Sequence, residues 1–244
     1  MSSILEITGV LLVGGMGTRL RSVVPAMPKP LASVGSRSFL ELLVRQLRSQ
    51  GIRRLVMCSG YLADQIEATF GDGRAWDVTI QYSREQQPLG TAGALKLAQC
   101  HLQEVDEFLV MNGDSFLEID FDQLVRFHRE RKGLASMAVV PVADTGRYGT
   151  VRVDPSGRVL GFTEKAGASG PGLINAGVYV FNRAIFGHIP EGPVSLEKNV
   201  FPFILDRGVY ALEQRGMFID IGTPEDYARA QVLCDRLCDA AFGR

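Results

Sequence analysis

The fold is decided by one stretch of sequence, Val10-Leu11-Leu12-Val13-Gly14-Gly15-Met16-Gly17-Thr18-Arg19-Leu20-Arg21, which is followed by Pro28-Lys29-Pro30. Its apolar beginning predicts a strand buried on both faces, and its glycines predict a loop whose backbone can approach a ligand closely. Successive free N–H groups in such a loop form a concavity for anions, to which Arg19 and Lys29 add full positive charges. We therefore expect a polyphosphate site at the carboxyl end of the first strand, where ligands bind in open α/β sheets.

This loop matches neither of the two common phosphate-binding patterns. The P-loop requires Gly-Lys-Ser/Thr after four intervening residues, and the sequence has no such run. The dinucleotide pattern G-x-G-x-x-G is met at Gly15 and Gly17 but has Leu20 in place of its third glycine, and no acidic residue follows the second predicted strand. A tight turn that binds nothing stays open as an alternative, but the two cations favour a phosphate loop of another kind.

Composition limits the class of protein. The 244 residues are enough for one α/β domain with a sizeable core, and a net charge of -1 argues against a nucleic-acid partner. No apolar stretch is long enough to cross a membrane, and the N-terminus lacks a signal-peptide pattern, so we expect a cytoplasmic protein without a membrane partner. The four cysteines show neither a disulfide framework nor a zinc set. A homo-oligomer stays open.

Strands and helices alternate in the first half of the chain, which is typical of βαβ units and a mainly parallel sheet. The second half reads mostly as strands linked by Gly/Pro/Asp turns. Predicted strands cover residues 7–13, 54–58, 78–82, 107–111, 135–142, 148–153, 158–163, 175–181, 209–212 and 217–221. Predicted helices run from a capping box at Ser38 to Gly51, over 63–70, 91–99 and 121–132, over 195–207 with a kink or break at Pro202, and from 225 to about 237.

The segment from Gly14 to Leu20, together with Pro28-Lys29-Pro30-Leu31, resembles the signature of the sugar-1-phosphate nucleotidyltransferases, and the resemblance covers nearly the whole chain. These enzymes condense a nucleoside triphosphate with a sugar 1-phosphate and release pyrophosphate. The resemblance implies a Rossmann-like three-layer α/β sandwich with a mainly parallel, mixed central sheet. It also implies a single domain, 1–244, with a nucleotide-binding half to about residue 132 and a sugar-binding half over 133–244.

Two aspartates are candidates for a Mg²⁺ site. Asp114 ends the fourth predicted strand and should share the sheet edge with the glycine loop, and Mg²⁺ in proteins is held by one or two carboxylates plus substrate phosphates. Asp220, in Phe218-Ile219-Asp220-Ile221-Gly222, offers the second carboxylate. Both motifs resemble the metal-binding aspartates of the family. The alternatives are a turn residue for Asp114 and a cap residue for Asp220, because the sequence alone does not bring the two together.

The second glycine element, Glu85-Gln86-Gln87-Pro88-Leu89-Gly90-Thr91-Ala92-Gly93, resembles the loop with which the family recognises the base. Its form is most like that of members that use GTP, although uridylyl transferases and others carry close variants; a simple loop and helix cap is the alternative. The resemblance implies nucleotide-binding roles for eight residues: Gly14, Gly15, Gly17, Thr18, Gln86, Pro88, Gly90 and Thr91.

On the sugar side, the resemblance implies contacts to the sugar phosphate from six residues: Tyr148, Gly149, Glu164, Lys165, Asn175 and Gly177. Taken singly, these motifs would also fit an exposed ion pair and a β-turn. The form Arg21-Ser22-Val23-Val24 and the segment Asp144-Thr145-Gly146-Arg147-Tyr148-Gly149-Thr150-Val151 are similar to the D-glycero-α-D-manno-heptose 1-phosphate guanylyltransferases. Mannose 1-phosphate is the alternative acceptor.

The implied reaction needs no general base, because the attacking phosphate oxygen of the sugar 1-phosphate is already ionised. Arg19 and Lys29 are the predicted catalytic residues: with Mg²⁺ and Lys165 they would screen the repulsion between two polyanions and stabilise the transferring phosphate. Two alternatives of another class remain, a non-catalytic regulatory relative of the same fold and a kinase-like NTPase. The retained cations and aspartates disfavour the first, and the missing P-loop disfavours the second.

Overall fold

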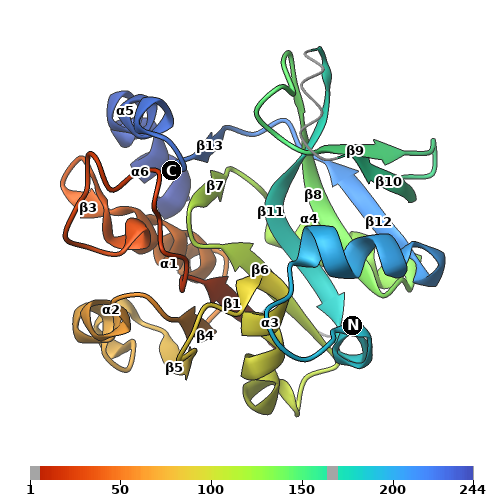
Figure 1. The fold of residues 1–244 in the computed structure, drawn as a ribbon, viewed down its shortest axis with the longest axis horizontal. Helices are drawn as coiled ribbons and strands as arrows, with labels where there is room; N and C mark the ends of the chain where they lie inside the picture. The colour runs from red at the N-terminus through yellow and green to blue at the C-terminus, as the bar shows by residue number, and fades with distance from the viewer. Residues whose placement is uncertain (1–5, 164–169, 244) are drawn as a thin grey trace.

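A mixed β-sheet forms the centre of the molecule, and helices cover both of its faces (Figure 1). The structure, a computed structural model, describes residues 6–163 and 170–243, so Glu164 and Lys165 lie outside the described residues. Within these ranges the sheet has nine strands in the order β10-β9-β11-β6-β1-β4-β5, with β8 paired to β11 and β12 paired to β8. The strands are β1 (Thr8–Leu12), β4 (Arg54–Ser59), β5 (Thr79–Arg84), β6 (Glu107–Asn112), β8 (Ala135–Val142), β9 (Thr150–Val153), β10 (Val159–Thr163), β11 (Gly172–Asn182) and β12 (Val209–Glu213).

The part of the sheet built from β6, β1, β4 and β5 is parallel throughout. Alternate residues of β1 enter two different cores: Leu11 packs in one and Val10 in the other, each at most 1% exposed. A strand buried on both faces has no polar side, which explains the continuous apolar run in the sequence. Strand β11 then joins β6 in antiparallel fashion, so the sheet continues from the first half of the chain into the second.

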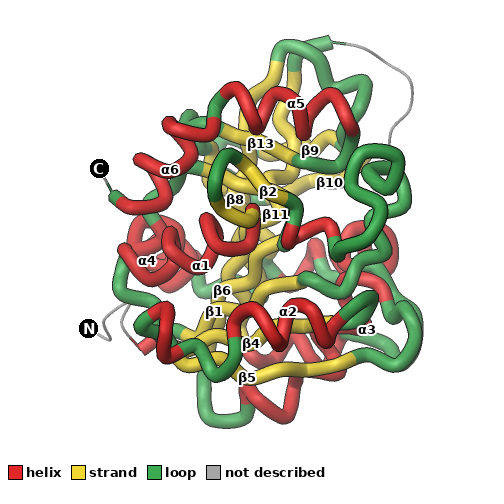
Figure 2. Tube along the Cα trace, turned by 90° about the vertical axis from the view of Figure 1, so that its left-hand side faces the viewer, coloured by secondary structure: helices red, strands yellow, loops and turns green. Residues whose placement is uncertain are grey.

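The helices form a layer on each face of the sheet. Side chains of α1, α2, α4, α5 and α6 pack in one core, and α3 packs in the other with the short helical turns of residues 183–207. Figure 2 shows α1, α2 and α6 in front of the strands. The α-helices are α1 (Phe39–Ser49), α2 (Ala63–Phe70), α3 (Gly90–Leu97), α4 (Phe121–Arg131), α5 (Pro224–Val232) and α6 (Cys234–Phe242). Ser38 caps α1 as predicted, since its hydroxyl accepts the Glu41 N–H at 3.2 Å, while the Glu41 carboxylate pairs with Arg37 and Arg45.

Two predicted helices are interrupted in the structure. The segment 195–207 forms three short turns, Leu196–Val200, Phe201–Phe203 and Leu205–Arg207, because Pro202 cannot donate the hydrogen bond that would continue a helix. The last helix, predicted to be continuous to about residue 237, bends at Leu233 and separates into α5 and α6. After the bend α6 packs on α1, and this contact buries Leu237 completely.

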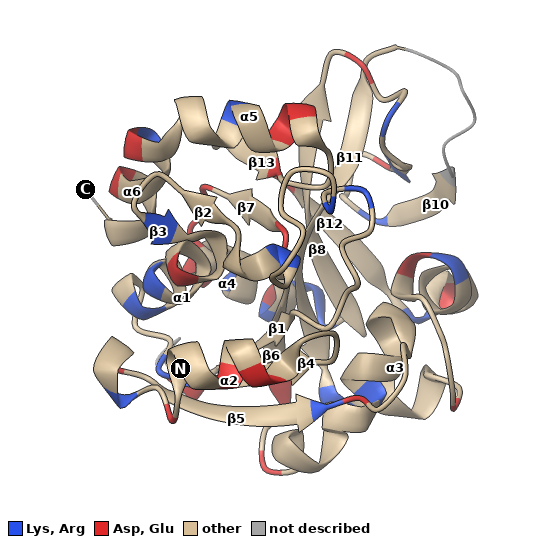
Figure 3. Ribbon diagram, turned by 60° about the vertical axis from the view of Figure 1, so that its left-hand side comes forward, with Lys and Arg blue, Asp and Glu red and all other residues tan. Residues whose placement is uncertain are grey.

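Two small sheets were not predicted, since strands of two or three residues are too short to show a periodic pattern. A hairpin joins β2 (Ser33–Val34) to β3 (Arg37–Ser38), and β7 (Ser115–Leu117) pairs with β13 (Phe218–Asp220). In both α1 and α5 the acidic residues lie in the first turn, and a basic residue lies in the last turn (Figure 3). None of the helices in the described ranges has the length and apolar character needed to cross a membrane.

Candidate active site

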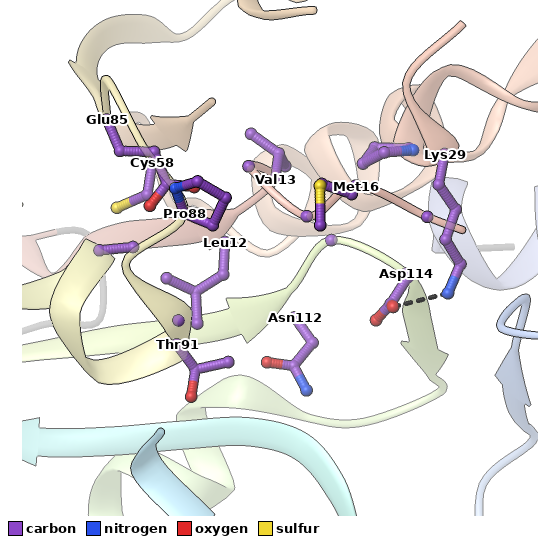
Figure 4. Close-up of a pocket in the computed structure, with 17 residues that line it drawn as sticks. Leu12, Val13, Met16, Lys29, Cys58, Glu85, Pro88, Thr91, Asn112 and Asp114 are labelled. Atoms are coloured by element: carbon purple, nitrogen blue, oxygen red, sulfur yellow. Dashed lines mark hydrogen bonds and ion pairs between the residues drawn. The ribbon is translucent and has the colours of Figure 1, made fainter. Parts of the chain in front are cut away.

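A cavity of about 310 Å³ opens at the carboxyl ends of β1, β4 and β6 (Figure 4). The glycine loop forms one wall, the loop after β5 forms another, and the end of β6 forms the floor. Predicted residues that line this cavity are Gly14, Gly15, Gly17, Lys29, Pro88, Gly90, Thr91 and Asp114. Gln86, also predicted to bind nucleotide, is exposed and is not part of the lining.

A second cavity, of about 670 Å³, lies on the other side of Lys29 and Asp114. Among the sequence-predicted residues it is lined by Thr18, Arg19, Tyr148, Gly149 and Asp220, together with Gly17, Lys29 and Asp114, which also line the first cavity. Two ligands placed in these cavities would therefore meet at a lysine and a carboxylate. The cavity wall also includes the ion pair between Arg147 and Asp226, whose Nη2 and Oδ1 atoms are 2.9 Å apart.

The junction is an ion-pair cluster of Lys29, Asp114 and Asp220. Lys29 Nζ donates to Asp114 Oδ2 at 2.7 Å and lies 3.9 Å from Asp220 Oδ1. Lys29 begins a short 3₁₀ turn between two prolines, and the buried Pro30 holds this turn against the core. This rigid backbone explains why a lysine side chain, usually mobile, has only 11% of its surface exposed here.

The two aspartates, distant in sequence, are brought together by the pairing of β13 with β7. The register aligns Asp220 with Ser115, and the Ile221 N–H donates to the Asp114 carbonyl at 2.9 Å. Because β7 directly follows Asp114, the pairing sets the position of both carboxylates. The two aspartates that the family resemblance implied for one metal site thus both approach Lys29, through strands that the sequence did not reveal.

The electrostatics of this cluster suit a cation. Burial, and after it the negative charge of Asp114, raises the pKa of Asp220 to about 6, although Lys29 opposes the shift. Two adjacent carboxylates that one lysine only partly neutralises are hard oxygen donors for a divalent ion. Among the described residues no group of three or more His, Cys, Asp or Glu could hold a metal, so an ion here would complete its coordination with substrate oxygens or water.

Glu85 is the functional candidate that the sequence analysis missed. Its carboxylate lines the first cavity, and its Oε2 accepts the Leu89 N–H at 3.0 Å. Room for the side chain comes from Gly14 and Gly60, since a Cβ at either position would lie 2.8 or 2.6 Å from Glu85 Oε1. Burial raises the pKa of this carboxyl. Glu85 follows β5 two residues after the buried Ser83, but burial along β5 does not alternate, so no sequence pattern distinguished Glu85 from Gln86.

The sugar-side residues are only partly gathered around the second cavity. Tyr148 and Gly149 line it, whereas Asn175 and Gly177 line neither cavity and instead form a turn within β11. Gly177 has a φ of +73°, and its N–H donates to Asn175 Oδ1 at 3.0 Å. A Cβ at Gly177 would lie 2.5 Å from the side chain of Asn112, which lines the first cavity. The turn therefore lies directly against the nucleotide-side wall.

Known proteins resemble this chain in sequence and in fold. The chain is 38% identical to the D-glycero-alpha-D-manno-heptose 1-phosphate guanylyltransferase of Aneurinibacillus thermoaerophilus, over 91% of this chain and 96% of that protein. It is 37% identical to the mannose-1-phosphate guanylyltransferase of Mycobacterium tuberculosis, over 92% of this chain but only 63% of that longer protein. The crystal structure of HddC from Yersinia pseudotuberculosis, also solved in complex with GMP-PN, superposes with a TM-score of 0.83 at 33% identity and covers 93% of this chain and 98% of its own. The family model for nucleotidyl transferase matches residues 8–235, and the chain therefore belongs to the nucleotidyl transferase family.

Proposed function

We propose that this protein transfers GMP from GTP to D-glycero-α-D-manno-heptose 1-phosphate, forming GDP-heptose and pyrophosphate for the synthesis of surface glycans. The observation that carries the proposal is the pair of cavities that share Lys29 and Asp114, one lined by the glycine loop and the base loop and the other by Arg19 and Asp220. The near-complete coverage of the heptose-specific relative favours the heptose phosphate over mannose 1-phosphate, which is the alternative acceptor.

The base pocket supports the choice of guanine. Glu85 presents a half-buried carboxylate in the first cavity, and guanine offers two neighbouring donors, its N1–H and its 2-amino group. Uracil and thymine lack the 2-amino donor, and adenine presents an acceptor at N1. A carboxylate that loses contact with water and gains no hydrogen-bond donor carries a large free-energy penalty. This position therefore selects against bases that lack such donors.

Catalysis would rest on position and charge. A phosphate oxygen of the sugar 1-phosphate attacks the α-phosphorus of GTP, and pyrophosphate leaves from the opposite side. Lys29, at the junction, and Arg19, on the wall of the second cavity, would stabilise the charge on the transferring phosphate. Members of this family generally use a divalent metal, and we propose that Asp114 and Asp220 hold Mg²⁺, which would neutralise the phosphoryl oxygens.

The sugar phosphate would lie in the second cavity. Tyr148 and Gly149 line its wall, and the turn of Asn175 and Gly177, which packs against Asn112 beside the first cavity, stays in the proposal through the sequence resemblance. Glu164 and Lys165 stay in the proposal as contacts to the sugar hydroxyls and the phosphate on the strength of the sequence resemblance alone. Because nucleoside triphosphates are cytoplasmic substrates, we propose that the reaction takes place in the cytoplasm.

The test is pyrophosphate release from a matrix of nucleoside triphosphates against sugar 1-phosphates, with and without Mg²⁺. We expect the highest kcat/KM with GTP and the manno-heptose phosphate, and no turnover after the metal is chelated. Preference for mannose 1-phosphate or for UTP would be consistent with the proposed type of reaction but would refute the proposed substrates. Absence of turnover with every pair, from folded protein, would refute the proposal in favour of a regulatory relative.

A further inference from the structure

A chain of polar side chains runs beside the first cavity, from the base loop to the turn in β11. It begins at Thr91, which lines the nucleotide cavity, and ends at Asn175. Its central members are Glu197, in the short helical turn Leu196–Val200, and Tyr179, on β11, which is fully buried. Neither central residue lines either cavity, so their side chains are held for a purpose other than direct contact with substrate.

The direction of each hydrogen bond in this chain is fixed by its neighbours. Thr91 Oγ1 accepts the Leu196 N–H at 2.8 Å, so its own proton is directed to Glu197 Oε2 at 3.2 Å. Ser195 Oγ likewise donates to Glu197 Oε2 at 2.8 Å. The Tyr179 hydroxyl accepts from Asn175 Nδ2 at 2.7 Å and donates to Glu197 Oε1 at 3.3 Å. Glu197 therefore receives three hydroxyl protons and donates none.

At the other end, the same chain shapes the sugar-side turn. Because Asn175 gives its amide N–H to Tyr179, its Oδ1 is left facing the Gly177 N–H, which it accepts at 3.0 Å. This bond stabilises the positive φ of Gly177 and the irregularity in the β11–β8 pairing between Asn175 and Tyr179. Burial, and after it the charge of Glu197, raises the pKa of Tyr179 well above its usual value, as expected if the hydroxyl stays protonated and donates to a carboxylate.

We propose that Glu197 is a positioning residue that fixes the sugar-binding turn, Asn175–Gly177, to the base loop at Thr91 through the buried hydroxyl of Tyr179. The inference rests on the proposed function, because it assigns the two ends of the chain to the two substrates. A carboxylate is required at the centre of the chain. Only a group that accepts at both oxygens can take the hydrogen bonds of Thr91 and Ser195 on one oxygen and that of Tyr179 on the other.

Substitution of Glu197 by Gln tests this requirement with almost no change of volume. The amide oxygen can still accept from Thr91 and Ser195, but the amide NH₂ would face the Tyr179 hydroxyl and leave its proton without an acceptor. The link to the sugar side is lost while the link to the base loop survives. Tyr179→Phe removes the same link from the other direction and leaves the packing of the ring against Phe181 and Phe201 in place.

The experiment is steady-state guanylyl transfer by the full chain, with KM determined separately for GTP and for the preferred sugar 1-phosphate. We expect Glu197→Gln and Tyr179→Phe each to raise the KM for the sugar 1-phosphate about tenfold, the usual effect of losing a hydrogen bond to a charged group, with the KM for GTP nearly unchanged. The double variant should be no worse than the worse single variant, because both changes break one connection. Glu191→Gln, on an exposed side chain just before this turn, is the matched control and should match the wild type.

Two results would overturn the inference while leaving the proposed function intact. One is multiplication of the single effects in the double variant, which would mean that the residues act independently. The other is a lower melting temperature with both KM values unchanged, which would mean that the chain only stabilises the fold. Absence of turnover in the wild-type protein would instead refute the proposed function, and the inference with it.

Discussion

Exchange of Glu85 for Gln is the most direct probe of how the protein would select its base. The Leu89 N–H donates to Oε2 at 3.0 Å, and an NH₂ group cannot accept this hydrogen bond. The oxygen of the new amide will therefore take the place of Oε2. The NH₂ then occupies the place of Oε1 between Gly14 and Gly60 and presents donors to the donors of guanine. A hydrogen bond to a charged group contributes about 1.5–3 kcal/mol, so kcat/KM for GTP should fall roughly 10- to 150-fold.

The assay is kcat/KM for GTP, ITP and ATP with one sugar 1-phosphate. ITP lacks the 2-amino group of guanine and should lose less than GTP on the exchange, and the GTP/ATP ratio should fall because adenine N1 can accept from the new NH₂. Gln86→Ala is the matched control, since this neighbour is exposed and outside the cavity lining, and its kinetics should not change. Equal losses for all three nucleotides, or wild-type activity with GTP, would refute base selection by Glu85.

Three further perturbations test the site and the fold. Asp114→Asn should lower kcat by about 10²–10³ without unfolding the protein, as for loss of one charge-stabilising group in other enzymes; turnover near that of the wild type would contradict its assignment to the metal. Gly177→Ala should raise the KM for the sugar 1-phosphate and destabilise the protein by at least about 1–2 kcal/mol in urea unfolding, because alanine disfavours a φ of +73° and its Cβ would lie 2.5 Å from Asn112. Burial lowers the pKa of His128 from 6.5 to about 4. Between pH 6.5 and pH 4 the unfolded state therefore binds more protons than the folded state. The free energy of unfolding should fall as the pH drops through this window, by about 2 kcal/mol at pH 5. His128→Asn, which can keep the bond to Ser136, should remove that part of the pH dependence, and an unchanged slope would contradict it.

The parts of the site that depend on local pattern could be predicted from the sequence. The apolar run, the glycine loop and the rigid Pro-Lys-Pro element are each specified by neighbouring residues, and the structure gathers them at one cavity. The proximity of Asp220 to Asp114 could not be derived in this way. It depends on the pairing of two three-residue strands that lie about a hundred positions apart, and such short strands carry no periodic signal.

Single side chains within the base loop are hard to predict for a different reason. Gln86 and Glu85 are adjacent polar residues after β5, and because burial along β5 does not alternate, the sequence pattern does not show which of them lines the cavity. Glu197 gave no sequence signal at all, because its partners Thr91 and Tyr179 come from separate elements that meet only in the folded core. The bend at Leu233 likewise follows from the packing of α6 on α1 and not from any helix-breaking residue.

The position of β6 in the sheet limits how the two halves of the protein can move. It is hydrogen-bonded to β1 on one edge and to β11 on the other, over five aligned residue pairs on each side. A hinge motion between the two halves of the chain would have to break the hydrogen bonds of one of these strand pairs. The two halves therefore form a single rigid sheet. Enclosure of the substrates must then come from loops at the edge of the sheet. In the loop after β1, Met16, Val23 and Met27 expose apolar surface that could become buried when the loop closes. Amide hydrogen exchange should be slowest along β6 and fastest in that loop.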